Sequence, residues 1–396
     1  MKKILVVGAG AYQVPLIKRC VELGYYVYAI DGNPSAVGFA YANESRVLNV
    51  VNKEACLVYA EEIGIDAVMT YGATVTLPTV AYVGRKMGLR VISDFAADLA
   101  TNKYLIKKRI AECGLNVFGG FASFTDRKSA LDFPFEYPCV LKPTDGSGSR
   151  GVVTVHAPDE LEDAVDYAFS GARYGEIYCE GFIQGDEYTV EAFSDGERAY
   201  VYSVVKTTFN RKGGLVDYGH RTPSGLGEKE ETLIKNEVHR VIEALKIDFG
   251  SVNMDVILSS EDGKPYVIDV GIRNGQNLIA SHFVPLSRGV SVLDNAILLA
   301  VGEEISPEPK FQKCIATRLL IYKPGFIKEI KHYDEVIGSN GIVDVVLRKR
   351  VGDYLPEYKE KSDTCGWVIT MGDTPDEAEK NAVKAKMLLE KYIIIE

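Results

Sequence analysis

Short apolar runs alternate with segments of mixed polarity over the first 95 residues of the chain. Four of the runs have the length and β-branched content of buried strands, and the segments between them have helical patterns. The strand-like runs are residues 3–8, 26–31, 65–72 and 89–93, and the helix-like segments are 12–24, 53–64 and 79–88. Strands that alternate with helices predict a parallel sheet covered on both faces. We therefore expect an α/β domain over residues 1–95.

The pattern is less regular after this domain. A helix is expected over 96–113, and mixed strands and short helices follow to about residue 185. A longer helix is expected over 229–246. The two apolar runs at 250–259 and 265–271 are separated by SEDGK, whose turn residues predict a β-hairpin.

The C-terminal part follows a segment rich in proline and acidic residues, GEEISPEPKFQ at 302–312, which is typical of a linker. Strands and one final helix are expected beyond it. The helix should begin directly after Thr374, because threonine is a favoured N-cap and Pro375 suits the first helical position.

The composition narrows the classes of protein that the chain could represent. Of its 396 residues, 46% are hydrophobic and 25% are charged, and the formal net charge of -10 disfavours a nucleic-acid binder. No apolar run approaches the roughly 18 residues of a membrane span. The seven cysteines form no C-x-x-C pair, which is typical of a reducing cytoplasm, and the five histidines lack zinc-ligand spacing. We expect a cytoplasmic protein of two to four domains.

The stretch VLKPTDGSGSRGVVTV at 140–155 holds three closely spaced glycines, Gly146, Gly148 and Gly151. Such loops let backbone N–H groups approach a phosphate closely. This loop lies between two strand-like runs, whereas a dinucleotide-binding loop opens a helix and a P-loop continues into G-K-S/T. A protein kinase would carry its strand lysine after the loop. The remaining interpretation is a phosphate site in a hairpin, with Lys142 placed before the loop.

A second glycine-rich turn, GAGAYQ at 8–13, follows the first predicted strand. A dinucleotide site would need a third glycine where Gln13 stands, although Asp31 ends the next strand as a ribose-binding acid would. A tight turn at Gly8 and Gly10, with a solvated Asp31, is the better interpretation.

Two acidic residues end the arms of the predicted hairpin. Asp255 and Asp269 would lie on adjacent strands, where two carboxylates can hold Mg²⁺ beside phosphates. Arg273 follows the second acid and can stabilise charge on a transferring phosphoryl group. The alternative is that both acids are merely solvated strand ends. Glu191 is interpreted as an ordinary outward-facing strand residue.

The chain resembles the ATP-grasp superfamily of carboxylate–amine ligases in the order of its motifs. That order is Lys103, Lys142, the glycine loop, CEGFIQGDEYTVE, Asp255, Asp269 and Arg273. The N-terminal segment VVGAGAYQVPLIKRCVELGYYVYAIDGNP looks like the pre-ATP-grasp domain. The tail, with KPGFIKEI and CGWVITMGDTPDEAEKNA, is similar to the C-terminal domain of the biotin-carboxylase-like and L-amino-acid ligase branches.

The resemblance implies three domains with α/β and α+β folds. A pre-ATP-grasp domain with a parallel sheet would occupy 1–95. A two-lobed ATP-grasp domain would occupy 96–305, with its flap-bearing lobe at about 118–186. A small C-terminal α+β domain would occupy 306–396.

The resemblance also implies a role for each matching residue. Arg273 and Lys142 would be catalytic, since the arginine matches one that supports an acyl-phosphate. His220 and Arg221 match a loop near the acceptor site and are substrate candidates together with Arg273. The ATP-binding residues that it implies are Lys103, Lys142, Ser147, Gly148, Ser149, Gly151, Glu180, Ile183 and Glu187.

The metal site departs from the family pattern. Asp255 and Asp269 stand where the family usually has glutamates that bind Mg²⁺, with Mn²⁺ as an alternative metal. The signature E-x-N-P-R-x-G-G is here DVGIRNGQ, so Gly271 replaces an asparagine that normally ligates metal. Asn274 or Asn253 could compensate for the missing oxygen.

The reaction implied by the resemblance joins a carboxylate to an amine. ATP would activate a small-molecule carboxylate, with an amino acid as first candidate, as an acyl-phosphate. An amine would then displace phosphate. A bicarbonate-dependent carboxylase of the biotin-carboxylase type and a non-catalytic nucleotide-binding module stay open as alternatives. No nucleic-acid or membrane partner is expected, and a homodimer is an assembly that the sequence leaves open.

Overall fold

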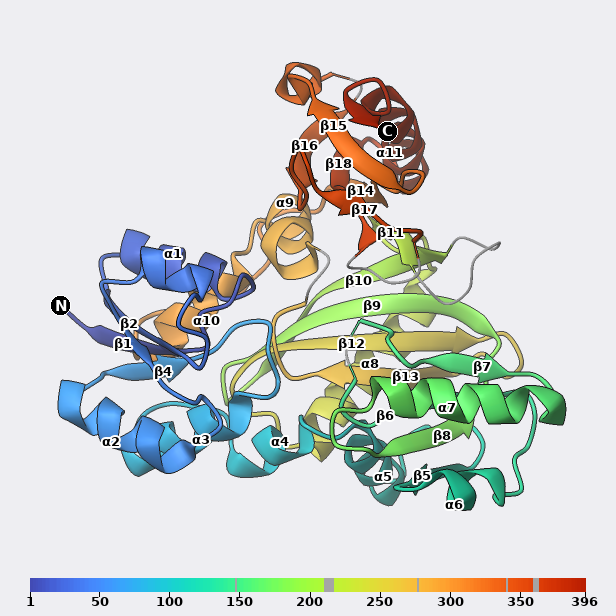
Figure 1. Cartoon of the computed structure of the whole chain (residues 1–396), viewed down its shortest axis with the longest axis horizontal. Helices are drawn as coiled ribbons and strands as arrows, with labels where there is room; N and C mark the ends of the chain where they lie inside the picture. Colours follow the sequence, from blue (N-terminus) through green and yellow to red (C-terminus); the bar gives the residue numbers. More distant parts are fainter. Residues whose placement is uncertain (147, 210–216, 276–277, 340, 359–362) are drawn as a thin grey trace.

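The N-terminal part of the chain, blue in Figure 1, is a parallel sheet between two layers of helices. The computed structural model describes residues 1–396 except 147, 210–216, 276–277, 340 and 359–362. The strand order is β3-β2-β1-β4. The strands are β1 (Lys3–Val7), β2 (Tyr26–Asp31), β3 (Glu44–Val47) and β4 (Ala67–Met69), and the helices are α1 (Val14–Glu22), α2 (Lys53–Ile63) and α3 (Leu77–Lys86).

The two faces of β1 bury alternate residues. Ile4 and Val6 pack with α1 and with α10 (Val292–Ala300), whereas Leu5 and Val7 pack with α2 and α3. Figure 1 shows α10 beside α1, although almost 270 residues separate them in sequence. The N-terminal sheet is therefore fixed to the rest of the molecule by a helix that belongs to a later part of the chain.

Three details of this domain differ from expectation. The segment 89–93 forms no strand, because Val91 packs directly on Gly84 of α3 and the chain enters α4 (Asp94–Leu99) at once. Strand β3 was not predicted, because all four of its residues are exposed at the edge of the sheet and carry no apolar signal. Asp31 is also more than a solvated acid, since its carboxylate accepts hydrogen bonds from the N–H groups of Ala9 and Asn33.

The helix expected over 96–113 is two helices, α4 and α5 (Lys103–Glu112). Asn102 separates them, because its side chain accepts a hydrogen bond from the N–H of Leu105 at 3.0 Å and so caps α5. The N–H of Lys103 donates to the carbonyl of Thr144 at 2.7 Å. The break therefore brings the start of α5 against the strand that carries Lys142.

A small antiparallel sheet follows, with strand order β5-β8-β6-β7. Its strands are β5 (Phe121–Phe124), β6 (Cys139–Pro143), β7 (Val153–Val155) and β8 (Ile177–Gly181), and α6 (Arg127–Leu131) and α7 (Leu161–Gly171) accompany it. The glycine loop connects β6 to β7, which pair as an antiparallel hairpin. The hairpin predicted around this loop is confirmed.

The largest sheet has eight strands in the order β13-β12-β9-β10-β11-β14-β18-β16. The strands from the middle of the chain are β9 (Gly185–Ser194), β10 (Ala199–Phe209), β11 (Asp217–Thr222), β12 (Gly250–Ser259) and β13 (Pro265–Gly271). The last two form the predicted hairpin. Helix α8 (Glu228–Ala244) matches the long helix expected at 229–246 and packs under this sheet.

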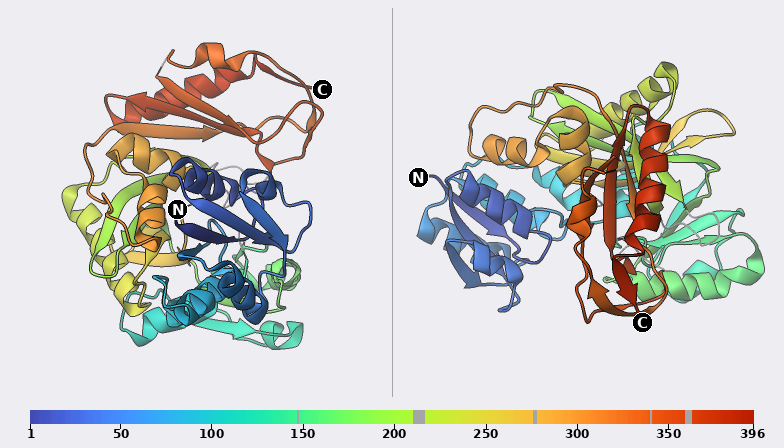
Figure 2. Two further views of the ribbon diagram at one scale, coloured as in Figure 1. Left: turned by 90° about the vertical axis from the view of Figure 1, so that its left-hand side faces the viewer. Right: turned by 90° about the horizontal axis from the view of Figure 1, so that it is seen from above.

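The C-terminal part continues the same sheet, because β11 pairs with β14 through Arg221 and Ala316. Helix α9 (Val284–Arg288) precedes α10, and the elements of the C-terminal part are β14 (Cys314–Leu319), β15 (Gly325–Ile330), β16 (Ile342–Leu347), β17 (Tyr354–Leu355), β18 (Gly366–Gly372), α11 (Pro375–Leu389) and β19 (Ile393–Ile395). Figure 2 shows this part as a compact layer of strands and α11. The Thr374 side chain caps α11 at the N–H of Glu377, as predicted.

Among the described residues, no single helix has the length and hydropathy of a membrane span. Only the bent pair Ile279–Arg288 and Val292–Ala300 reaches that hydropathy when its two parts are taken together.

Candidate active site

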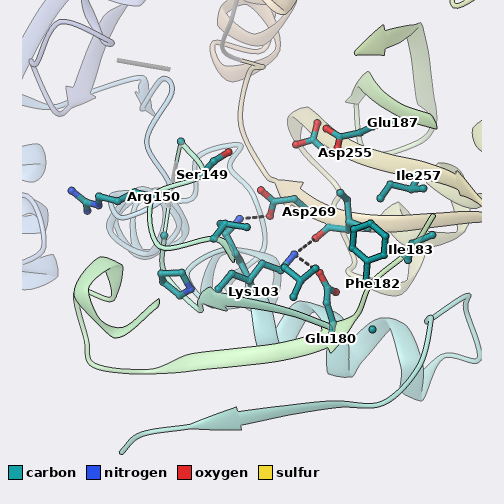
Figure 3. A pocket seen from close by; sticks show the side chains of 18 residues that line it. Lys103, Ser149, Arg150, Glu180, Phe182, Ile183, Glu187, Asp255, Ile257 and Asp269 are labelled. Atoms are coloured by element: carbon teal, nitrogen blue, oxygen red, sulfur yellow. Dashed lines mark hydrogen bonds and ion pairs between the residues drawn. The ribbon is translucent and has the colours of Figure 1, made fainter. Parts of the chain in front are cut away.

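An open cleft of about 970 Å³ lies between the small sheet and the large sheet. Figure 3 shows that side chains from both sheets point into it. The cleft is lined by Lys103, Val140, Lys142, Pro143, Gly146, Gly148, Ser149, Arg150, Val152, Glu180, Gly181, Phe182, Ile183, Glu187, Asp255, Ile257, Ile268 and Asp269. Most of the nucleotide and metal residues expected from the sequence are thus brought together in one cavity.

The large sheet supplies one wall through alternate residues of its strands. Glu187 pairs with Ile257, and two residues further along Thr189 pairs with Asp255. Asp255 pairs in turn with Asp269 on β13. Residues two apart along a strand share a face of a sheet, and so do residues that are paired on neighbouring strands. The two candidate metal acids therefore lie side by side in the wall of the cleft. The Thr189 hydroxyl donates to Asp255 at 2.8 Å and orients its carboxylate.

A buried ionic cluster forms the opposite wall. The Glu180 carboxylate is paired with Lys142 and, at 2.8 Å, with Lys107. The two ammonium groups also donate to carbonyls of β13, Lys107 to Val267 at 3.1 Å and Lys142 to Ile268 at 3.0 Å. The cluster contains two cations and one anion, and its members that line the cleft are Lys142 and Glu180.

The pKa values in this cluster follow its ion pairs. Burial by itself would raise the pKa of Glu180, but Lys107 and Lys142 hold it below its ordinary value. Burial would lower the pKa of Lys142, but Glu180 raises it far above its ordinary value. Lys142 therefore stays charged at neutral pH and can meet a phosphate.

Lys103 is paired with Asp269, one of the two acids. Burial opposes ionisation of Asp269, but Lys103 and Lys142 lower its pKa to about 2. The acid is therefore ionised and ready to bind a cation. Lys103 reaches it from the first residue of α5, where the break at Asn102 has placed it.

The glycine loop closes one side of the cleft. Gly148 and Ser149 have φ angles of 69° and 63°, a left-handed turn that presents this part of the backbone to the cavity. Gly151 does not line the cleft, because it packs behind the loop, where a Cβ atom would come within 2.8 Å of Pro143. Ser147 lies outside the described residues.

Phe182, Ile183 and Ile257 form an apolar end of the cleft, next to Glu187 (Figure 3). A flat aromatic base fits such an end, with its ribose near the Glu187 carboxylate. The loop and the lysines lie towards the other end, where phosphates would then be placed. The residues present therefore fit ATP by shape, polarity and charge.

The two aspartates also fit Mg²⁺. No group of three or more His, Cys, Asp or Glu side chains within the described residues could enclose a metal ion. Mg²⁺ does not require such a cage, because it keeps several waters and is held by one or two carboxylates together with phosphate oxygens. Asp255 and Asp269 would supply those carboxylates.

Arg273 folds back over Gly271. A Cβ atom on Gly271 would lie 3.3 Å from the Arg273 guanidinium carbon, and the φ of Gly271 is not in the left-handed region. The glycine therefore makes room for the arginine. Arg273 donates to the carbonyl of Asn274 at 3.0 Å. The buried side-chain amide nitrogen of Asn274 has no hydrogen-bond partner among the described residues.

Glu191 does not face outwards, so that interpretation is wrong. Its side chain is fully buried, and its carboxylate accepts hydrogen bonds from Asn253 and from the N–H of Gly275. Burial raises its pKa to about 8. The two-residue period from Glu187 through Thr189 to Glu191 is the sequence signal that could have revealed its position on the cleft side of β9.

His220 and Arg221 are not brought to this cleft. His220 is buried with its ring 6.2 Å from that of Phe283. Arg221 pairs with Asp376 and, at 3.2 Å, with Glu379 of α11. Its contacts join β11 to the C-terminal part, so a substrate role for either residue stays a prediction.

Two family models match the chain. One, described as the ATP-grasp domain, covers residues 100–275, and the other, described as L-amino acid ligase C-terminal domain 2, covers residues 318–392. Residues 100–275 therefore form an ATP-grasp domain. The matched regions contain the lysines, glycine loop and acids of the cleft, and also the C-terminal strands that extend the large sheet.

Curated relatives of this ATP-grasp chain are distant in sequence. A Sinorhizobium fredii protein, y4rH, is 26% identical over 382 residues, which are 93% of this chain and 78% of that protein. The formate-dependent phosphoribosylglycinamide formyltransferase of Dechloromonas aromatica is 27% identical over 190 residues, which are 46% of this chain and 48% of that one. The match thus spans about half the length of such formyltransferases.

Solved structures share the whole architecture. The L-amino acid ligase from Bacillus licheniformis has a TM-score of 0.83 at 21% identity, covering 100% of this chain and 99% of that one. Biotin carboxylase from Campylobacter jejuni has a TM-score of 0.73 at 16% identity, covering 100% and 92%. The predicted fold class is confirmed, and the predicted resemblance to ATP-grasp proteins is confirmed by the domain match.

The ionic cluster predicts unequal effects of removing its members. Glu180→Gln leaves two buried ammonium groups without their anion, and we expect it to lower the free energy of unfolding by about 3 kcal/mol or more. Lys142→Met leaves Glu180 paired with Lys107, so its loss should be clearly smaller. Urea denaturation of both variants measures the difference. Equal losses would show that Glu180 does not hold the cluster together.

Burial of Glu191 predicts a pH dependence of stability. An unfolded glutamate releases its proton near pH 4.5, whereas the folded protein keeps this proton to about pH 8. Between these values the folded state binds more protons, so its stability falls as pH rises. Glu191→Gln has no proton to lose, and we expect its stability relative to the wild type to increase between pH 5 and pH 8. A difference that does not change with pH would contradict this.

Proposed function

We propose that the protein is an ATP-dependent ligase that activates a small-molecule carboxylate and joins it to an amine, with release of ADP and phosphate. One observation carries the proposal: two carboxylates, Asp255 and Asp269, face a buried cluster with excess positive charge across a cleft closed by a glycine loop. This is the arrangement needed to hold a metal-bound polyphosphate and to position its terminal phosphoryl group.

The protein would act mainly by positioning and by neutralising charge, as in phosphoryl transfer generally. The apolar end of the cleft holds the base, and Lys142 and the loop N–H groups bind the phosphates. Asp255 and Asp269 would hold Mg²⁺, which would supply positive charge for the terminal phosphates. Lys103 would leave Asp269 for the phosphates when the acid receives the metal. Closure of the loop over the cleft excludes water from the activated carboxylate.

Arg273 would stabilise the phosphoryl group during transfer. It follows Asp269 by four residues, its guanidinium lies over Gly271, and its charge contributes to lowering the pKa of Asp269. A substrate carboxylate entering beside it would attack the terminal phosphorus in line with the leaving ADP. The amine would then attack the carbonyl carbon of the acyl-phosphate and form the new carbon–nitrogen bond. The bond between that carbon and the phosphate oxygen would break, and phosphate would leave with its electron pair.

An amino acid is the first candidate for the carboxylate. The support is the C-terminal region, which matches the family model of the L-amino acid ligase C-terminal domain, together with the similarity to the Bacillus licheniformis L-amino acid ligase over the full chain.

A substrate screen tests this proposal. We expect amino acids, offered singly and in pairs with MgATP, to stimulate phosphate release and to yield a product whose mass is the sum of both substrates minus one water. Stimulation by bicarbonate alone would instead support a carboxylase. MgATP binding without turnover in any arm would support a non-catalytic module.

Lys142→Met should abolish turnover. Loss of one charge-assisted contact to the phosphoryl group during transfer is expected to lower kcat by about 10²–10³-fold. The protein should stay folded, because Glu180 retains Lys107. Steady-state phosphate release and thermal melting measure the two effects. Near-normal turnover in the variant would show that Lys142 does not contact the transferring phosphoryl group.

Gly271→Asn tests how the metal is held. The backbone at Gly271 accepts a side chain, and only the flexible end of Arg273 would have to move. We expect half-activation at lower Mg²⁺ because an amide oxygen is added, and a lower kcat because Arg273 is displaced. A Mg²⁺ titration of ATP turnover separates the two. Unchanged Mg²⁺ dependence together with unchanged kcat would show that this position does not contact the metal.

A further inference from the structure

Glu191 lies one step beyond the two aspartates on the cleft side of the large sheet. It pairs in register with Asn253, as Thr189 pairs with Asp255 and Glu187 with Ile257. Each step is two residues, or roughly 6.6 Å along a strand. The direction of these steps runs from the apolar end of the cleft, past the aspartates, to Glu191. Glu191 therefore stands next to the place where the terminal phosphoryl group would be.

Its carboxylate is occupied by two donors. Both oxygens accept from the N–H of Gly275 at 3.1 Å, and one accepts from the Asn253 amide at 3.1 Å. A Cβ atom on Gly275 would lie 2.4 Å from the Glu191 oxygen. Only glycine permits this approach, so the turn at 273–275 is seated directly on the carboxylate.

The turn that Glu191 holds is the one that carries Arg273. The guanidinium donates to the carbonyl of Asn274, the residue directly before Gly275. The peptide between Asn274 and Gly275 thus has its N–H fixed by Glu191 and its carbonyl engaged by Arg273. Rotation of this peptide would break both contacts together.

We propose that Glu191 is a positioning residue that fixes the 273–275 turn and thereby aims Arg273 at the phosphoryl group during transfer. The inference rests on the proposed function in one respect, that the cleft binds MgATP. Glu191 acts through the hydrogen bonds it accepts and not as a base, because its side chain is fully buried and both oxygens are already engaged.

Variants at three positions separate this role from a structural one. Glu191→Ala removes both hydrogen bonds. Glu191→Gln keeps an oxygen for Gly275, and Asn253 can turn its amide to accept from the new NH₂ group. Gly275→Ala forces the turn off an intact carboxylate. The matched control is Glu237→Ala in α8, because Glu237 is also buried and also accepts from a backbone N–H, that of Asn116, but pairs with Arg240 and not with the 273–275 turn.

The measurement uses MgADP with and without aluminium fluoride, which mimics a phosphoryl group in flight and needs no knowledge of the carboxylate or amine. Calorimetry gives the affinity for MgADP alone and the gain in affinity on adding aluminium fluoride. Thermal melting is recorded for every variant.

We expect the wild type and Glu191→Gln to show similar gains. Glu191→Ala and Gly275→Ala should bind MgADP alone with normal affinity. Their gain in affinity on adding aluminium fluoride should be smaller by about 10-fold or more, since a displacement of about 1 Å can cost 10²-fold in catalysis. Glu237→Ala should melt at a lower temperature and keep the gain. This pattern would show that Glu191 positions Arg273 and does not act only by stabilising the fold.

Three results would overturn the inference. A full gain in Glu191→Ala would show that the turn holds without the carboxylate. A loss in Glu191→Gln as large as in Glu191→Ala would show that the hydrogen bonds that glutamine can keep do not position the turn. A wild type that binds MgADP but gains nothing from aluminium fluoride would show that Arg273 is not aimed at the transfer site. Failure of the wild type to bind MgADP would instead refute the proposed function, on which the inference rests.

Discussion

The buried carboxylate of Glu180 between Lys107 and Lys142 is the interaction on which the cleft depends. Burial costs each ion several kcal/mol, so neither lysine could occupy its place without an anion between them. Because both ammonium groups also donate to carbonyls of β13, the cluster joins the small sheet to the strand that carries Asp269. The same three residues therefore fix the distance between the two walls and leave one positive charge for a phosphate.

The large sheet then sets the order of the chemistry along the cleft. Alternate residues of β9 and β12 face the cavity, and their pairs run from Glu187 and Ile257 to Thr189 and Asp255 and on to Glu191 and Asn253. In the proposed function, the base, the metal and the phosphoryl group would be separated by whole steps of the strand period. Pairing of β11 with β14 continues the same sheet into the C-terminal part.

Much of the fold and of the nucleotide cleft could be predicted, because the signals were local or ordered along the chain. The hairpin of β12 and β13 followed from its turn residues, and Lys142 from its place before the glycine loop. Other features depend on tertiary contacts. Asn102 splits one apparent helix because its side chain caps α5, and residues 89–93 pack on Gly84 and form no strand.

The site residues that were not predicted have only weak signals in the sequence. The structure is needed to distinguish them from surface charges. Lys107 lies one helical turn after Lys103, so both project from the same side of α5. Glu191 continues the two-residue period of Glu187 and Thr189. Each spacing is equally typical of solvated surface charges, and burial distinguishes the two cases. Burial depends on which elements cover a residue, and that information is spread over segments distant in sequence.

The charge balance of the cleft explains why its lysines and acids can coexist with the polyphosphate site of the proposed function. Lys103 neutralises Asp269, and Glu180 offsets one of its two lysines. In the proposed function, MgATP would bring a cation that needs carboxylates and an anion that needs ammonium groups. Asp269 would exchange Lys103 for the metal while Lys103 would exchange the acid for a phosphate, so each charge would keep an opposite partner. Because the buried charges of the cleft are already paired, binding would require only an exchange of partners.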